Sequence, residues 1–289
     1  GLFIGLQKTK TSSIVVGFFS ITNIIFSLIF VVYFNLNVQG VALGTLISST
    51  LTSIIFLFFT FFEFKKITNL EFNYKKIFNF NKIKNIFNIN LNIFIRSILL
   101  TFSFLFFTYL GNSISEDVVA ANTILINLIM LSAFILDAYA FSTEGLVGYS
   151  IGSKNKKLLK EIIKNSFILS SSTGLIISFG YFLGKNHFIE IMTDLESIKI
   201  ICISYSVWIV IIPFISSFCY QFDGIFVGAS KTKELRNAMM MSVGIYLLTA
   251  ILLVKFFGNL GLWIALSVFF ILRGLTLFLY LGRIYKAAV

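Results

Sequence analysis

Residues 11–62 read TSSIVVGFFSITNIIFSLIFVVYFNLNVQGVALGTLISSTLTSIIFLFFTFF and contain no Asp, Glu, Lys or Arg. A helix needs about 20 apolar residues to cross the hydrocarbon core of a bilayer, so this stretch predicts two membrane-spanning helices. The sequence NLNVQG at residues 35–40 separates them, because Asn and Gly favour turns. We therefore expect an all-α membrane protein with eight transmembrane helices, since further apolar windows predict six more, at roughly 87–110, 118–151, 165–184, 200–222, 237–257 and 262–282.

The composition of the chain points the same way. Of its 289 residues, 57% are hydrophobic and 12% are charged, whereas soluble domains carry about a quarter charged residues. A soluble globular domain, a disordered chain and a secreted disulfide scaffold are therefore excluded. The two cysteines, Cys202 and Cys219, lie in apolar sequence, and His187 is the single histidine. We expect no metal, no cofactor and no disulfide.

The basic residues fall almost entirely in the loops of one side. Eighteen of the 23 are Lys8, Lys10, Lys65, Lys66, Lys75, Lys76, Lys82, Lys84, Lys154, Lys156, Lys157, Lys160, Lys164, Lys231, Lys233, Arg236, Arg283 and Lys286. Cytoplasmic loops collect Lys and Arg, so we expect both ends of the chain in the cytoplasm. The net charge of +11 is spread over short clusters, which indicates contact with membrane lipids and no nucleic acid.

The sequence also contains an internal repeat. Residues 1–10, GLFIGLQKTK, match residues 224–233, GIFVGASKTK, at six of ten positions. A span, a short turn and a second span follow each copy, and six predicted helices separate the copies, which is typical of a transporter built from parallel repeats. We predict that residues 1–62 are the last two helices of an N-terminal lobe, 63–86 a basic cytoplasmic linker and 87–289 a complete six-helix C-terminal lobe. The chain would then be the C-terminal part of a two-lobed, 12-helix (6+6) transporter.

Four segments resemble the multidrug and toxin extrusion family. They are LQKTKTS at residues 6–12, NIFIRSILL at 92–100, LDAYAFSTEGLVGYSIG at 136–152 and DGIFVGASKTKELRNAM at 223–239, and the second and third are most similar to its DinF-type branch. The resemblance spans essentially the whole chain, at the position of the family's helices five to twelve, so the sequence looks truncated at its N-terminus.

The resemblance implies a function. It implies a multi-pass exporter of the bacterial inner membrane that expels organic cations and toxic small molecules by proton or sodium antiport, through alternating access. The best-known coupling carboxylate of the family belongs to a first helix that this chain lacks. A sodium-coupled branch carries a carboxylate in the seventh helix, where this chain has Arg96, so we expect proton coupling. We also expect a monomer.

Charged residues inside the predicted spans are the candidate site residues, because an ionised group costs about 2.5–3.5 kcal/mol at mid-membrane. Asp137 and Glu144 lie seven residues apart, on one face of a helix. Asp137 is either a titrating, cation-binding group or part of a fixed polar contact between helices. Arg96 and Glu144 lie at similar predicted depths on neighbouring spans, so we expect them to form a buried ion pair.

The remaining intramembrane residues have structural interpretations. Lys255 and Arg273 lie near predicted span ends, where long side chains reach the headgroups. Asp223 is expected to pair with Lys231 and Lys233 at the cytoplasmic surface. Pro213 is the only proline and should bend its helix, either as a hinge for alternating access or simply to shape the packing.

Two other functions remain as alternatives. A flippase for lipid-linked precursors would need a strongly basic central cavity, and only Arg96 and Arg273 offer such charge. A membrane-embedded enzyme would need a motif such as HExxH or a nucleophile with an activating partner, and the sequence contains neither. We therefore favour export and do not expect an enzyme.

Overall fold

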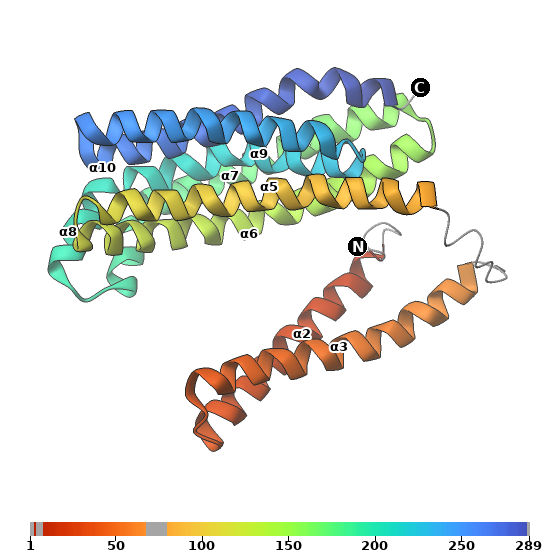
Figure 1. Cartoon of the computed structure of the whole chain (residues 1–289), viewed down its shortest axis with the longest axis horizontal. Helices are drawn as coiled ribbons and strands as arrows, with labels where there is room; N and C mark the ends of the chain where they lie inside the picture. Colours follow the sequence, from red (N-terminus) through yellow and green to blue (C-terminus); the bar gives the residue numbers. More distant parts are fainter. Residues whose placement is uncertain (1–2, 4–7, 68–79, 288–289) are drawn as a thin grey trace. The chain divides into compact units, whose positions relative to one another are not determined.

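The computed structural model describes residue 3, residues 8–67 and residues 80–287, and the elements found there are helical (Figure 1). They are α2 (Thr9–Leu28), the π-helical turn η1 (Ile29–Tyr33), α3 (Asn37–Ile67), α5 (Phe80–Asn112), α6 (Glu116–Gly152), α7 (Lys156–Met192), α8 (Glu196–Tyr205), α9 (Val207–Gly228) and α10 (Thr232–Ala287). Within the described part, seven helices are long and apolar enough to cross a membrane. The prediction of an all-helical membrane protein is confirmed.

The helix α10 accounts for two of the predicted spans. Its 56 residues are interrupted at Gly258, whose φ of 55° and ψ of −132° are not helical, so the segments before and after this residue run in opposite directions (Figure 1). A glycine is favoured here because a positive φ is strained for residues with a Cβ atom. The turn predicted between residues 257 and 262 is therefore found where the sequence places it.

The chain divides into two compact units, Gly1–Ile83 and Lys84–Val289, which are described separately. Of the predicted linker 63–86, residues 68–79 lie outside the described residues. On either side of this gap, α3 continues to Ile67 and α5 begins at Phe80. Both helices therefore extend beyond the apolar windows that predicted them.

The first unit is a helical hairpin. Asn35 and Asn37 have positive φ values of 54° and 45°, which confirms the predicted turn, but Gly40 lies inside α3. Gly44 of α3 packs against α2 so closely that a Cβ atom there would lie 2.6 Å from the Oγ atom of Ser27. Small residues let helices approach closely in a membrane, so this glycine fixes the hairpin.

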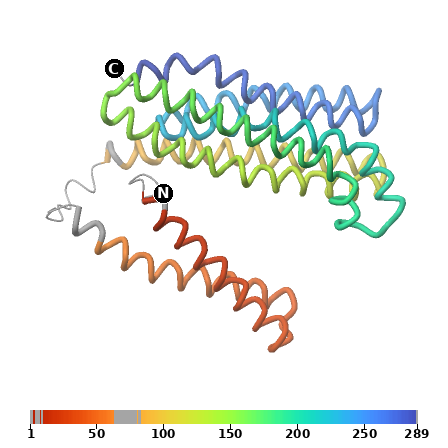
Figure 2. The backbone as a smooth tube through the Cα atoms, turned by 180° about the vertical axis from the view of Figure 1, so that it is seen from behind, coloured from red at the N-terminus to blue at the C-terminus, as the bar shows by residue number. Residues whose placement is uncertain are grey.

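The second unit contains α5 to α10, whose long helices run alongside one another (Figure 2). The most buried of its candidate spans is α9. A Cβ atom on Gly224 of α9 would lie 2.3 Å from the backbone oxygen of Ala140 on α6, and one on Gly228 would lie 2.4 Å from the backbone oxygen of Glu144. The backbones of α6 and α9 are therefore in direct contact.

A buried polar cluster holds the reversal of α10 against the start of α6. The side-chain amides of Asn122 and Asn259 bond each other in both directions, at 2.7 and 3.1 Å. The indole nitrogen of Trp263 donates to Oδ1 of Asn122 at 2.9 Å. Each of these buried polar groups thus has a partner, which fixes where α10 turns.

Replacing Gly224 by Ala is expected to destabilise the second unit by about 1–3 kcal/mol, because the added methyl group meets the backbone of α6. The matched control is Gly244→Ala in α10, where a Cβ atom would have no neighbour within 4 Å. The control should be neutral or stabilising by up to about 1 kcal/mol, since Ala is the better helix former. Thermal unfolding of the two detergent-solubilised variants measures both effects, and equal loss of stability would contradict the close contact.

Candidate functional site

Two arginines and one aspartate from three helices form an ion-pair cluster inside the second unit. Nη2 of Arg273, on α10, donates to Oδ2 of Asp223, on α9, at 2.6 Å. Nη2 of Arg96, on α5, donates to the same oxygen. One carboxylate oxygen therefore binds two guanidinium groups, which leaves the three residues with a net charge of +1.

The three side chains differ in exposure: Arg96 on α5 is the most exposed and Arg273 on α10 is the most buried. The exposed fraction is 18% for Arg96, 11% for Asp223 and 2% for Arg273. Aromatic rings surround the most buried of the three: the Cζ atom of Arg273 lies 5.5 Å from the ring centre of Phe269, 5.8 Å from that of Tyr220 and 5.9 Å from that of Phe270. Such ring faces attract a cation but accept few hydrogen bonds.

Each of the two guanidinium groups has N–H donors that form no hydrogen bond within the described part of the chain. Nε of Arg96 and both Nε and Nη1 of Arg273 are buried and have no hydrogen-bond partner among the residues that the structure describes. A buried donor left unpaired costs about 1–3 kcal/mol, and more when it is charged. The cluster is therefore short of acceptors.

Asp137, on α6, is a fourth ionisable residue that interacts with this cluster. Its carboxylate is half-buried and interacts electrostatically with Asp223, Arg96 and Arg273. In the described part of the chain, it forms neither a hydrogen bond nor an ion pair. Its negative charge balances the +1 of the three other residues, so the four ionised groups sum to zero.

The expected ion pair between Arg96 and Glu144 is wrong. Arg96 binds Asp223, which lies 127 residues further along the chain, and Glu144 has no ion pair or hydrogen bond through its side chain within the described part of the second unit. Glu144 is half-buried and its backbone supports the contact of α6 with Gly228. The prediction failed because similar depth on neighbouring spans does not determine which faces of two helices meet.

Asp223 and Arg273 are site residues that the sequence-based interpretation missed. Asp223 was expected to pair with Lys231 and Lys233, and Arg273 to reach the headgroups, but both residues are buried. The helices α9 and α10 extend past the apolar windows, to Gly228 and Ala287, so both residues lie deeper than the windows suggest. Lys255, by contrast, is exposed as expected.

Pro213 lies inside α9, and the helix is interrupted at Ser206, seven residues earlier, between α8 and α9. The predicted span at 200–222 is therefore divided between two helices. A Cβ atom on Gly174 of α7 would lie 3.1 Å from the backbone oxygen of Pro213. The proline thus lies where α7 and α9 pack closely.

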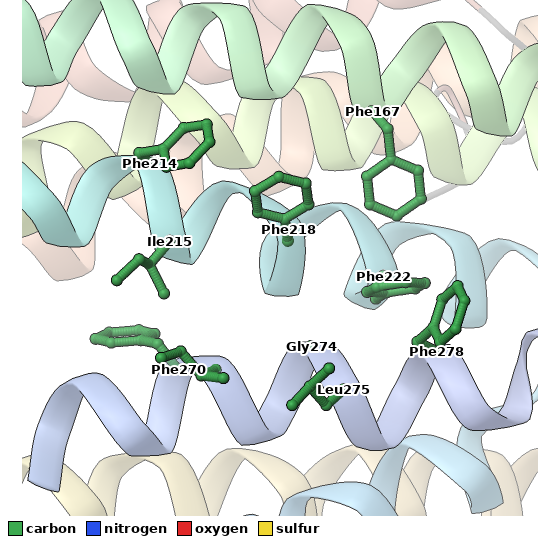
Figure 3. A pocket seen from close by; sticks show the side chains of 10 residues that line it. Phe167, Phe214, Ile215, Phe218, Phe222, Phe270, Gly274, Leu275 and Phe278 are labelled. Atoms are coloured by element: carbon green, nitrogen blue, oxygen red, sulfur yellow. The ribbon is translucent and has the colours of Figure 1, made fainter.

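An apolar cavity of about 550 Å³ lies between α7, α9 and the second half of α10 (Figure 3). It is lined by Phe167, Phe214, Ile215, Phe218, Phe222, Phe270, Ile271, Gly274, Leu275 and Phe278. Phe270 belongs both to this lining and to the aromatic surroundings of Arg273. The cavity therefore adjoins the ion-pair cluster but offers it no polar group.

Comparison with known proteins identifies the family to which this chain is similar. The family model MatE matches residues 93–254. The chain is 31% identical over 277 residues to the DNA damage-inducible protein F of Escherichia coli (strain K12), covering 96% of this chain and 60% of that protein. It is 24% identical over 284 residues to Protein DETOXIFICATION 43 of Arabidopsis thaliana, covering 96% of this chain and 51% of that protein.

A solved structure agrees with the fold. A mutant of the Vibrio cholerae MATE transporter VcmN superposes with a TM-score of 0.85 at 18% sequence identity, over 98% of this chain and 66% of that one. The chain thus spans about half to two thirds of the length of these relatives.

Proposed function

Since this chain belongs to the MatE family, we propose that it forms the C-terminal part of a secondary active exporter with two lobes of six helices. Two observations support this. The segment 224–233 repeats the sequence of 1–10, as expected for duplicated lobes. In the described part of the second unit, five helices are candidate spans, and α10, which reverses at Gly258, counts as two, so the unit supplies the six spans that one lobe requires. The residues of the first unit would then be the last hairpin of the other lobe.

The proposed activity is the export of organic cations and toxic small molecules in exchange for protons. The observation that carries it is the placement of Asp137, a half-buried carboxylate on a membrane-spanning helix that has neighbouring charges but no ion pair in the described part of the chain. A carboxylate in such a position is available to bind either a proton or a cationic group. Alternating access then exchanges the two across the membrane.

The other predicted site residues take supporting roles in this proposal. Arg96 holds Asp223 in its ion pair, and it stands where a sodium-coupled branch of the family carries a carboxylate, which supports proton coupling. Glu144 lies two turns from Asp137 on α6 and provides a second carboxylate on the path of a cation. Pro213 serves as a hinge in α9. The protein would lie in the bacterial inner membrane, with both ends of this chain in the cytoplasm.

Transport by the full-length protein in proteoliposomes tests this function. Ethidium, a permanent organic cation, should be driven by an imposed proton gradient, and the proton carrier nigericin should abolish its transport. A sodium gradient without a proton gradient should drive none. Ethidium transport that follows the sodium gradient and survives nigericin would contradict proton coupling.

A further inference from the structure

We propose that the apolar cavity between α7, α9 and the second half of α10 is a groove for one acyl chain of an anionic phospholipid, whose headgroup is bound by Lys160 and Lys164. The groove contains none of the residues of the ion-pair cluster, and the proposal does not depend on the proposed transport function. It is supported by the lining of the groove, by its depth in the membrane and by the charge at one of its ends.

The lining of the groove suits a hydrocarbon chain. Its ten residues are Phe, Ile, Leu and Gly, and six of them are phenylalanines, so their side chains offer a ligand no hydrogen bond. Leu275 and Phe278 are exposed, which leaves the groove open along one side. Lipid chains are as apolar as this lining and can enter it from the bilayer without losing hydrogen bonds, whereas a polar ligand would lose them.

The groove extends over the depth of one leaflet. Phe214 and Phe222 lie eight residues apart on α9, as do Phe270 and Phe278 on α10, which corresponds to about 12 Å along each helix. One half of the hydrocarbon core is about 15 Å thick. Phe222 and Phe278 lie within four residues of the ends of their predicted spans, so the groove runs from the membrane surface toward the midplane. An acyl chain of one leaflet has the same direction and extent.

The surface end of the groove adjoins two lysines. At this end the ring centres of Phe167 and Phe222 lie 4.8 Å apart, and those of Phe222 and Phe278 lie 6.4 Å apart (Figure 3). Lys164 and Lys160 precede Phe167 by three and seven residues, or about 5 and 10 Å along the helix, on the same face of α7. Both lysines are exposed. A chain in the groove therefore ends beside two positive charges.

A contact between α7 and α10 confirms on which side Lys160 lies. Its Nζ atom is 6.0 Å from the ring centre of Tyr285, which follows Phe278 by seven residues on the same face of α10. The helix faces that line the groove thus continue past its surface end to this contact. Within the described residues neither Lys160 nor Lys164 forms an ion pair, so both ammonium groups are available to a phosphate.

The combination of groove and lysines distinguishes an anionic phospholipid from other occupants. An organic cation would be repelled by the two ammonium groups, and a lipid without net charge would fill the groove but gain little from them. An anionic phospholipid uses both features, since its chain packs against the phenylalanines while its phosphate lies at the level where basic residues attract anionic headgroups.

Photo-crosslinking of the full-length protein in lipid nanodiscs tests the inference. The nanodiscs consist of phosphatidylcholine with a small fraction of a probe, either phosphatidylglycerol or phosphatidylcholine, that carries a diazirine in the middle of one acyl chain. Mass spectrometry of peptides then locates the label. Phosphatidylglycerol should label the residues that line the groove at least about tenfold more than phosphatidylcholine does, because only its net negative charge is attracted by the two lysines.

Two variants separate the role of the chain from that of the headgroup. Gly274→Leu places a side chain in the groove without a backbone clash, since a Cβ atom there would lie 3.9 Å from the Cβ atom of Phe218. It should reduce labelling of the groove by both probes severalfold. Lys160→Gln combined with Lys164→Gln should reduce labelling by phosphatidylglycerol to the level of phosphatidylcholine and leave labelling by phosphatidylcholine unchanged.

Each variant has a matched control that should label like wild type. Gly244→Leu introduces the same side chain elsewhere on α10, where a Cβ atom would have no neighbour within 4 Å. Lys185→Gln combined with Lys255→Gln removes the same charge, but near the other end of α7 and just before the reversal of α10.

The wild-type protein alone decides the question, even where a variant fails to fold. Equal labelling of the groove by the two probes would show that no anionic headgroup is selected and would overturn the inference. Label found only outside the groove would mean that another part of the protein or a second copy covers this face, and would overturn it as well. Ethidium export is measured separately, so neither result bears on the proposed function.

Discussion

Replacement of Asp223 by Ala is expected to destabilise the second unit by about 3–5 kcal/mol, because removing one partner of a buried ion pair leaves uncompensated charge. Two arginines lose their counterion in this variant, and Arg273, at 2% exposure, cannot reach water. The buried thiols of Cys202 and Cys219 provide the readout, since a thiol-reactive fluorescent dye labels them only when the unit unfolds. The temperature of half-maximal labelling should fall steeply.

Two further variants make the Asp223 result specific. Asp194→Ala removes an exposed carboxylate and should leave the labelling temperature unchanged. Asp223→Asn combined with Arg96→Gln leaves one unpaired arginine in place of two, so it should recover part of the lost stability. An unchanged labelling temperature for Asp223→Ala would show that this carboxylate does not hold the two arginines.

Asp137→Asn is expected to lower proton-driven export by at least about tenfold while the amount of folded protein stays close to wild type. General acid–base groups contribute factors of this size or larger, and an amide cannot exchange a proton at ordinary pH. Folding should be unaffected because Asp137 has no ion pair to lose in the described part of the chain. Initial rates of ethidium transport, divided by the amount of folded protein in the same proteoliposomes, measure the effect.

The control for Asp137→Asn is Asp194→Asn, which changes an exposed carboxylate between α7 and α8. Its transport rate should match wild type. Equal transport rates per folded molecule for wild type and Asp137→Asn would show that coupling does not require Asp137.

The helices and their turns could be predicted from the sequence because both depend on neighbouring residues. An uninterrupted apolar window marks a span, and NLNVQG and Gly258 mark reversals, since Asn and Gly adopt positive φ at low cost. Asp137 was found in the same way, as a single charge within an apolar window. These features need no knowledge of which helices lie side by side.

The ion-pair cluster could not be predicted, because it depends on packing. Asp223 lies near Lys231 and Lys233 in sequence, but its partners are 127 and 50 residues away. The spacing of Gly224 and Gly228 was a usable signal, since small residues four apart mark a face where helices meet. Spacing alone does not suffice, however: a Cβ atom on Gly152, which lies four residues after Gly148, would have no neighbour within 4 Å.

The contact of Gly224 and Gly228 with the backbone of α6 limits how the second unit can change shape. The contact leaves no room for a side chain between the two helices there, so we expect the part of α9 that follows Pro213 to move together with α6. The arginines of α5 and α10, by contrast, reach α9 through long side chains that can extend or swing. We therefore expect a rearrangement that opens this unit to displace α5 or α10 around the contact at Gly224 and Gly228, and to exchange or break the ion pairs of Arg96 and Arg273 with Asp223.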